Sequence, residues 1–511
     1  MKRLNRILYS NKFLALTMLL LQIAAFVLMF IWISDYSKAL MGLTTLLSAV
    51  FIIYEINRAE EPTFKMTWIM LIAIIPVFGV LFYIFTRRGT ISRNIGHDYK
   101  TAQEQNMLYL EYNSEIIKEL DAIDRREGSF SKYLGRYGGS PAFSDTAVQY
   151  YPIGEKMFED IKKELQRAEK FIFMEFFIIN SSSRMWKEIF DILKQKARQG
   201  VEVRVMYDGM GCVGIVPSGY DEVVRRQGIK CRIFSPIVPL ISTHQNNRDH
   251  RKIIVVDGAT AFCGGINLAD EYINERDRFG HWKDTGIMLR GRAVAGFTSM
   301  FLDMWNINSD DVENGEEYIR ASEQFSASAG GYVIPFGDSP LDDVYVGKRA
   351  YIHNLDSAVD YVYIMTPYLV IDDEMYESMK YAAQRGVDVK IIMPHIPDKK
   401  YAFYLARTYY RELLMAGIEI YEYTPGFVHA KVSVSDGCRA IVGTINHDYR
   451  SLYLHYECAA YMLNVPAVMA VESDFKETLA KSQRITLETV KHFGIFSKLI
   501  GHIVRLVAPL I

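Results

Sequence analysis

The stretch HRKIIVVDG, residues 250–258, has a near copy in HAKVSVSDG, residues 429–437. Both stretches contain runs of β-branched residues, which favour a strand, and both end in Asp-Gly, which favours a tight hairpin turn. Because residues two apart in a strand share one face, the histidine and the lysine that begin each stretch lie side by side. The sequence therefore predicts two similar β-hairpins, each carrying a matched histidine and lysine.

Each hairpin is also predicted to bring an amide to this face. If the Asp-Gly pair forms a two-residue turn, the strand returning through TAFCGGIN pairs Gly265 with His250 and places Asn267 on the face of His250 and Lys252. Gly265 is small, so we expect room for a substrate opposite the histidine.

The second copy repeats this arrangement through RAIVGTIN. Thr444 is predicted opposite His429, and Asn446 on the face of His429 and Lys431. The two copies differ at one point, because Thr444 adds a hydroxyl that the first copy lacks.

The aspartate of each motif has a different predicted role. Asp257 and Asp436 lie at an odd spacing from the histidine, so their side chains should not share its face. We include both among the candidate site residues as groups that fix the turn and orient the hairpin, rather than as acids or bases.

These residue types together suit phosphodiester chemistry. A lysine ammonium and an asparagine amide can bind phosphoryl oxygens, while one neutral imidazole attacks phosphorus and a protonated one donates to the leaving oxygen. A single copy would more often be a buried hairpin with a satisfied histidine. The duplication favours a two-histidine phosphodiester site instead.

The two H-x-K-x-x-x-x-D motifs, each followed by G-x-x-N, resemble those of the phospholipase D superfamily. Flanking segments narrow the resemblance to bacterial cardiolipin synthases. These segments are EPTFKMTWIMLIAIIPVFGVLFYIF at residues 61–85, TPYLVIDDEM at 366–375 and ELLMAGIEIYEYTPGFVHAK at 412–431.

The resemblance implies an α/β fold in which N-terminal transmembrane helices precede two phospholipase D-like α/β repeats, packed with pseudo-two-fold symmetry around one active site. It also implies transfer of a phosphatidyl group between two phosphatidylglycerol molecules, giving cardiolipin and glycerol through a phosphatidyl-histidine intermediate. In the superfamily's usual order His250 is the nucleophile and His429 the acid and base. The two motif lysines, with Asn267 and Asn446, would hold the phosphoryl oxygens.

No cofactor or metal is expected for this reaction. One phosphodiester is exchanged for another, the lysines supply positive charge, and the sequence shows no carboxylate cluster with metal-ligand spacing. The net charge of -2 gives no basic footprint and argues against a nucleic-acid partner. The five cysteines are odd in number and lack C-x-x-C spacing, which favours reduced packing residues.

Alternating helix and strand patterns also favour an α/β fold. We expect the following divisions: a transmembrane anchor at 1–88, a neck at 89–145, a first repeat at 146–320, a second repeat at 335–485 and an amphipathic tail at 486–511.

The anchor contains three hydrophobic segments, at residues 13–33, 39–54 and 66–86. The first and third are long enough to span a hydrocarbon core of ~30 Å. A signal peptide is the alternative for the first, and a buried core helix for the second. Basic flanks before the first and after the third both favour the cytoplasm, so the number of spans stays open. We expect a multi-pass protein of the bacterial cell membrane with a cytoplasmic catalytic part.

The tail is predicted to contact anionic membrane lipid, including phosphatidylglycerol. Lys491, Lys498 and Arg505 recur every seven residues, so a helix would carry a basic stripe beside an apolar face. A helix docked on the protein is the alternative.

Two carboxylates and several further histidines complete the candidates. Asp284 and Glu457 could hydrogen-bond the ring nitrogens opposite the reacting ones, or could be ordinary surface or turn carboxylates. Four other histidines are expected to be structural or rim residues: His244, His281, His395 and His447.

Two other functions share parts of this pattern. A membrane-bound phosphodiesterase that hydrolyses phospholipid or nucleic acid would use the same motifs with water as acceptor. A non-catalytic membrane scaffold would show degenerate motifs, but every histidine and lysine is present in both copies.

Overall fold

The structure is a computed structural model that describes residues 24, 38–87, 90–236, 246–307, 313–327, 329–342 and 344–510. Except for one residue, the predicted hydrophobic segment at 13–33 lies outside the described residues, as do its basic flank and His244.

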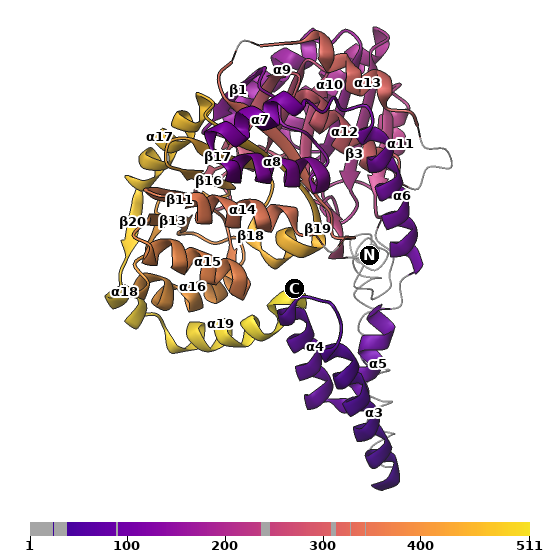
Figure 1. The fold of residues 1–511 in the computed structure, drawn as a ribbon. Helices are drawn as coiled ribbons and strands as arrows, with labels where there is room; N and C mark the ends of the chain where they lie inside the picture. Colours follow the sequence, from indigo (N-terminus) through magenta and orange to yellow (C-terminus); the bar gives the residue numbers. More distant parts are fainter. Residues whose placement is uncertain are drawn as a thin grey trace.

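Two mixed β-sheets form the body of the molecule (Figure 1). Their strands follow the same order. The first sheet runs β1 (Thr146–Tyr151), β9 (Gly286–Gly291), β7 (Thr260–Gly264), β6 (Lys252–Val256), β2 (Phe171–Phe176), β3 (Glu202–Asp208), β4 (Lys230–Phe234). The second runs β10 (Tyr332–Asp338), β19 (His455–Leu463), β17 (Arg439–Gly443), β16 (Val432–Ser435), β11 (Tyr361–Met365), β13 (Asp388–Pro394), β14 (Glu419–Tyr423), β20 (Ser482–Ile485). The predicted α/β fold with two repeats is confirmed.

The sheets face each other across one hydrophobic core. Phe173 and Ile253 of the first sheet and Val432 and Val434 of the second belong to the same buried cluster. Two helices complete this inner layer: α12 (Val294–Trp305) and α17 (Ala467–Leu479). Every residue of α12 is buried, and this helix contacts strands of both sheets. The core therefore holds the two halves face to face.

Amphipathic helices cover the outer face of each sheet. Those on the first sheet are α9 (Gly154–Arg167) and α10 (Arg184–Arg198), and those on the second are α14 (Val346–Ser357), α15 (Asp373–Gln384) and α16 (Lys400–Met415). The segment predicted as a neck forms α6 (Thr90–Met107), α7 (Ser114–Ile123) and α8 (Arg125–Tyr137), and α6 and α8 pack against the body at α12 and β10.

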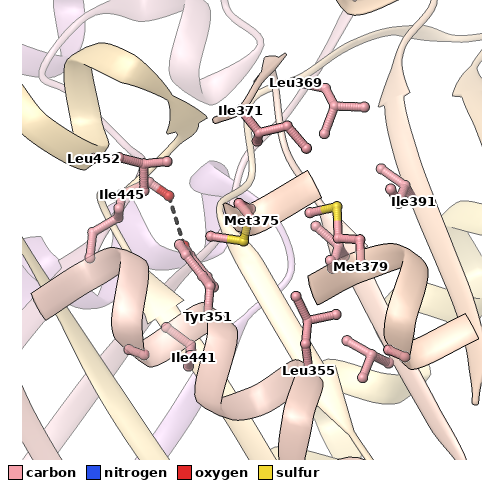
Figure 2. Packing of buried hydrophobic residues seen from close by; sticks show 14 of the residues in the cluster. Tyr351, Leu355, Leu369, Ile371, Met375, Met379, Ile391, Ile441, Ile445 and Leu452 are labelled. Carbon is pink, nitrogen blue, oxygen red and sulfur yellow. Dashed lines mark hydrogen bonds between the residues drawn. The ribbon is translucent and has the colours of Figure 1, made fainter. Parts of the chain in front are cut away.

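The outer core of the second half supports the segment that follows its motif (Figure 2). Tyr351 on α14 packs with Met375 and Met379 of α15, and its hydroxyl donates to the Ile445 carbonyl at 2.7 Å. Ile445 directly precedes Asn446, so this buried bond positions the Gly-x-x-Asn segment.

Two short strands cross between the halves. β5 (Arg248–Asp249), just before the first motif, pairs in parallel with β19 of the second sheet. β15 (Gly426–Val428), just before the second motif, pairs in parallel with β8 (His281–Lys283) of the first half. The residues just before each motif therefore pair with the other half, and the motif then continues into a strand of its own sheet.

The Asp-Gly pairs form the predicted turns. At Asp257 and Gly258 φ is 54° and 68°, and at Asp436 and Gly437 it is 51° and 62°. Two consecutive left-handed residues are the requirement of a type I′ turn, which glycine and aspartate tolerate better than most residues.

The predicted hairpin register is wrong by one residue. Val256 pairs with Thr260, because a third residue joins the Asp-Gly pair in the loop. Continuing this register places His250 opposite Ile266 rather than Gly265, and the second hairpin is displaced in the same way. The register therefore does not bring the asparagines to the histidine face.

The motif aspartates bind backbone amides away from the histidines. Asp257 accepts hydrogen bonds from the amides of residues 169–171 at 2.7–2.8 Å. Asp436 accepts from the amides of residues 359–361 at 2.9 Å. Each carboxylate ties its turn to the start of the neighbouring strand, β2 or β11.

The N-terminal helices extend away from the body (Figure 1). They are α3 (Lys38–Ile56), α4 (Pro62–Ile74) and α5 (Pro76–Arg87). The predicted segment 66–86 is not one helix, because Pro76 lacks an amide proton and disfavours helical backbone at Ile75, where φ is -130°. Within the part of the chain that the structure describes, no helix combines the length and the apolarity needed to cross a membrane.

We predict that Asp436→Ala lowers thermal stability. It removes the acceptor of three backbone hydrogen bonds, and bonds to a charged group contribute about 1.5–3 kcal/mol each. The Tm of the full chain, measured by circular dichroism, should fall by several degrees. Asp436→Asn, which keeps one acceptor oxygen, should fall less. Asp360→Ala at the adjacent exposed position is the control, and an equal Tm for the two alanine variants would contradict this role.

Candidate active site

The opposite half of the molecule holds the backbone of each motif histidine. The His250 amide donates to the Tyr456 carbonyl at 3.0 Å, and the His429 amide donates to the Lys283 carbonyl at 2.7 Å. These bonds continue the crossed strand pairs β5–β19 and β15–β8. Both histidines are consequently placed at the boundary between the two sheets.

The opposite half also supplies a carboxylate to each ring. Nδ1 of His250 lies 2.8 and 3.0 Å from the two carboxylate oxygens of Glu457. Nδ1 of His429 lies 2.7 Å from Oδ2 of Asp284. Both carboxylates are fully buried. Asp284 and Glu457 therefore contact the histidine rings as the sequence suggested, and the structure adds that the two pairs cross.

This contact decides which ring nitrogen can react. A carboxylate at Nδ1 accepts the Nδ1 proton of a neutral imidazole, which leaves the lone pair on Nε2. His250 and His429 therefore both present an unprotonated Nε2 when the carboxylate holds the Nδ1 proton. At His429 the Lys431 ammonium also lies 2.9 Å from Nδ1 and competes with Asp284 for that nitrogen.

The small residues beside the motifs make room for these carboxylates, not for a substrate. A Cβ at Gly265 would lie 2.0 Å from Oδ1 of Asp284. At the matching place in the second half, the Thr444 hydroxyl donates to Glu457 and accepts from the Cys458 amide at 3.0 Å. The prediction of substrate space at these positions is therefore wrong, because a buried carboxylate fills it.

The two motif lysines are buried in the same site. Nζ of Lys252 donates to the His250 carbonyl, and Nζ of Lys431 donates to the His429 carbonyl. Burial lowers the pKa of both ammonium groups, and that of Lys431 falls to about 7. The charge of Lys252 also lowers the pKa of Lys431, so motifs from both halves share one electrostatic environment.

Burial keeps both imidazoles neutral near pH 7. Burial and, to a smaller extent, the charge of Lys431 lower the pKa of His429 to about 4, against the opposing effect of Asp284. Burial likewise lowers the pKa of His250 well below its ordinary value, against the opposing effect of Glu457.

The asparagines are buried but differ in their contacts. The Asn267 side-chain oxygen accepts from the Ile178 amide at 2.9 Å, and its amide donates to the Tyr272 hydroxyl at 2.8 Å. The Asn446 side-chain oxygen has no hydrogen-bond partner among the described residues. A role for either in holding phosphoryl oxygens stays a prediction.

The sequence reasoning missed one histidine at this site. The His455 ring lies 5.4 Å from the His250 ring, and the side chain is buried. The sequence does indicate its position, because His455 lies two residues before Glu457 and residues two apart in a strand share one face. The position matching His455 in the first half is Trp282, whose ring lies 5.3 Å from that of His429. The two sides of the site are therefore chemically different.

The structural or rim role expected of the other histidines stays a prediction. His447 is fully buried against Tyr351, His281 contacts the Tyr423 hydroxyl, and His395 is half-exposed beside Glu422.

Comparison with known families supports these observations. A family model described as "Cardiolipin synthase, PLD-like domain" matches residues 161–301 and 351–479. A second, described as "Phospholipase_D-nuclease N-terminal", matches residues 45–88.

Relatives match nearly the full length of the chain. An uncharacterized protein of Streptococcus mutans is 49% identical over 90% of this chain and 99% of its own length. A cardiolipin synthase of a Geobacillus species is 32% identical over 96% of this chain and 98% of its own length. Another from Alkalihalophilus pseudofirmus is 32% identical over 94% of this chain and 95% of its own length.

A solved structure shares the fold. The phosphatidylserine synthase of Haemophilus influenzae superimposes with a TM-score of 0.58 and 13% identity, covering 75% of this chain and 99% of that one. Both motif regions lie inside the matched repeats, and the relatives span almost the whole sequence. The chain therefore belongs to the PLD-like cardiolipin synthase family.

Proposed function

We propose that this protein is a phosphatidyltransferase that joins two phosphatidylglycerol molecules into cardiolipin and releases glycerol. The observation that carries this proposal is the pair of buried imidazoles, each with Nδ1 on a carboxylate from the other half and Nε2 available for reaction. The named cardiolipin synthases among the relatives support the choice of substrate.

In the first step, Nε2 of His250 attacks the phosphorus of one phosphatidylglycerol. The bond from phosphorus to the glycerol oxygen breaks, and that oxygen takes a proton from His429. Glu457 stabilises the positive imidazole that forms at His250. Lys252 and Lys431 lie at the same site and would hold the phosphoryl oxygens as negative charge develops.

The substrate itself can supply the proton-donating form of His429. Burial and Lys431 keep this ring neutral in the free protein. An anionic phosphodiester adds a negative charge nearby, which favours the imidazolium and raises its pKa. His429 would therefore take up its proton as the substrate binds.

In the second step, His429 removes the proton from a hydroxyl of a second phosphatidylglycerol. The oxygen attacks phosphorus, the bond from phosphorus to His250 breaks, and cardiolipin is released. One phosphodiester replaces another, so the chemistry requires no nucleotide and no cofactor.

The C-terminal helix α19 (Ile495–Val507) supports a location at the cell membrane. Its outward face exposes Ile495, Phe496, Leu499 and Ile503, each by more than half. Its inward face is fixed by Gly501, because a Cβ there would lie 2.4 Å from the Tyr404 carbonyl oxygen on α16. The helix thus docks on the protein by a narrow face and keeps a broad apolar face for lipid.

The same region offers positive charge to anionic lipid. The end of α19 lies beside α4, where the Thr67 hydroxyl donates to the Leu506 carbonyl at 3.2 Å (Figure 1). A cavity of about 510 Å³ lies between α16, α18 (Leu487–Lys491) and α19. Its lining includes Arg411, Lys491 and Lys498 together with Glu412, and also Arg407, whose guanidinium is paired with Glu422.

We predict that the purified protein converts phosphatidylglycerol in detergent into cardiolipin and free glycerol, identified by mass spectrometry. His250→Ala and His429→Ala should each lower the rate by at least about 10³-fold, because neither half contains a substitute nucleophile or acid. Phosphatidic acid as the sole product would favour hydrolysis. Substantial activity in either variant would contradict the shared site.

We predict that Glu457→Gln and Asp284→Asn each lower kcat by about 10²–10⁴-fold without unfolding the protein. An amide can donate to Nδ1 and move the ring proton to Nε2, where it blocks reaction. Glu488→Gln, beside the exposed His492, is the matched control and should keep full activity. If kcat falls less than fivefold in both site variants, the carboxylates of the opposite half do not orient the histidine rings for reaction.

We predict that kcat/KM falls roughly fivefold between pH 7 and pH 8. Burial lowers the pKa of Lys431 to about 7, so its ammonium is present below that pH and is lost as pH rises through it. Lys431→Arg stays charged throughout this range, and the falling limb should disappear. A flat wild-type profile between pH 6 and pH 8, or the same limb in Lys431→Arg, would contradict this assignment.

A further inference from the structure

One side of the active site carries three potential metal ligands that the proposed reaction does not need together. They are His250, His455 and Glu457, all buried, and one ligand atom from each lies within 4.8 Å of the others. We propose that these three residues form a binding site for a borderline divalent cation such as Zn²⁺, and that the bound ion reversibly inhibits the protein.

The distances require only small movements. Nδ1 of His250 lies 2.8 Å from Oε1 of Glu457, and Nδ1 of His455 lies 3.7 Å from the same oxygen. With zinc bonds of about 2.0–2.2 Å in tetrahedral geometry, ligand atoms lie about 3.4 Å apart. Shifts of about 1 Å would therefore bring all three groups onto one ion.

His455 provides an independent sign that a ligand belongs here. Its side chain is 8% exposed, and neither ring nitrogen has a hydrogen-bond partner among the described residues. A buried imidazole without a partner is costly, and strain, a catalytic role or a bound water or ion can account for such a group. The His447 ring also has no hydrogen-bond partner among the described residues, but His455 differs from it in lying within ligand distance of His250 and Glu457. The contact at 3.7 Å to Glu457 is too long for a hydrogen bond.

The mirror-related position in the other half shows that this set is not a general consequence of the fold. There the counterparts of His250 and Glu457 are His429 and Asp284, but Trp282 replaces His455. An indole offers no lone pair to a metal. Only the side with the proposed nucleophile can therefore supply three ligands.

The ligand types select the class of ion. Two imidazoles and one carboxylate with an open fourth position suit Zn²⁺, whereas Mg²⁺ and Ca²⁺ prefer oxygen ligands. The positive charge of Lys252 disfavours a second cation nearby. The Glu457 carboxylate offsets this repulsion because it would bind the ion directly. We therefore expect weaker binding than in a structural zinc site.

Inhibition follows from the ring nitrogen that the ion would occupy, and this step rests on the proposed function. The ion takes the lone pair of Nδ1 on His250, so the ring proton resides on Nε2. A protonated Nε2 cannot attack phosphorus. Removing the ion returns the proton to Nδ1 and restores the contact with Glu457.

The binding test uses the full-length protein in detergent, freed of metal with a chelator and titrated with Co²⁺. We expect visible d–d absorption of a four-coordinate ion that saturates at one Co²⁺ per chain. His455→Asn and His455→Gln should lose this absorption while keeping the wild-type circular dichroism. His395→Asn should keep it, because the His395 ring pairs with Glu422 and is not part of the three-residue cluster. No absorption in the wild type, or equal absorption in both His455 variants, would overturn the site.

The activity test separates this site from the proposed function. Zn²⁺ should inhibit the wild type, a chelator should restore the rate, and the inhibitory concentration should rise at least tenfold in His455→Asn. Co²⁺ binding in a protein that never forms cardiolipin would refute the function but not the site. Full activity that Zn²⁺ does not change would refute the inhibition.

Discussion

The rest of the structure depends on the crossed bond between His250 and Glu457 and its counterpart between His429 and Asp284. Neither repeat contains a complete pair, because each histidine needs a carboxylate from the other half. The crossed strands bring these groups together, and the hydrophobic core between the sheets keeps the halves in register. The crossed pairs therefore form only where the two halves meet.

Burial gives this site its chemical character. Two carboxylates, two lysines and two histidines lie out of water, where an unpaired charge is costly. Burial is the largest cause of the lowered pKa of both histidines, the motif lysines add to it, and the carboxylates oppose the combined lowering only in part. The free site therefore holds neutral imidazoles beside a cationic group. An anionic phosphodiester adds a negative charge to this site and so favours protonation of an imidazole, which is the form of His429 that the proposed mechanism requires.

The two sides of the site are related by symmetry but not equal. On the first side Glu457 receives a hydroxyl hydrogen bond from Thr444 and lies near His455. On the second side, Gly265 stands in place of Thr444 and Trp282 stands in place of His455. Different surroundings support different roles for the two histidines. The motif residues alone give no basis for that distinction, because they are nearly identical in both copies.

Local patterns in the sequence predict the two Asp-Gly hairpins, the α/β class and the kinds of side chain at the site. The register was wrong by one residue, because period and turn type do not reveal a third loop residue. The helix break at Pro76 is not evident from composition, because residues on both sides of the proline are mostly apolar. Which carboxylate meets which histidine depends on strand pairs between residues about 200 positions apart, as at β5 and β19. Only the tertiary structure could decide that, because local sequence constrains neighbours along the chain and not partners across a core.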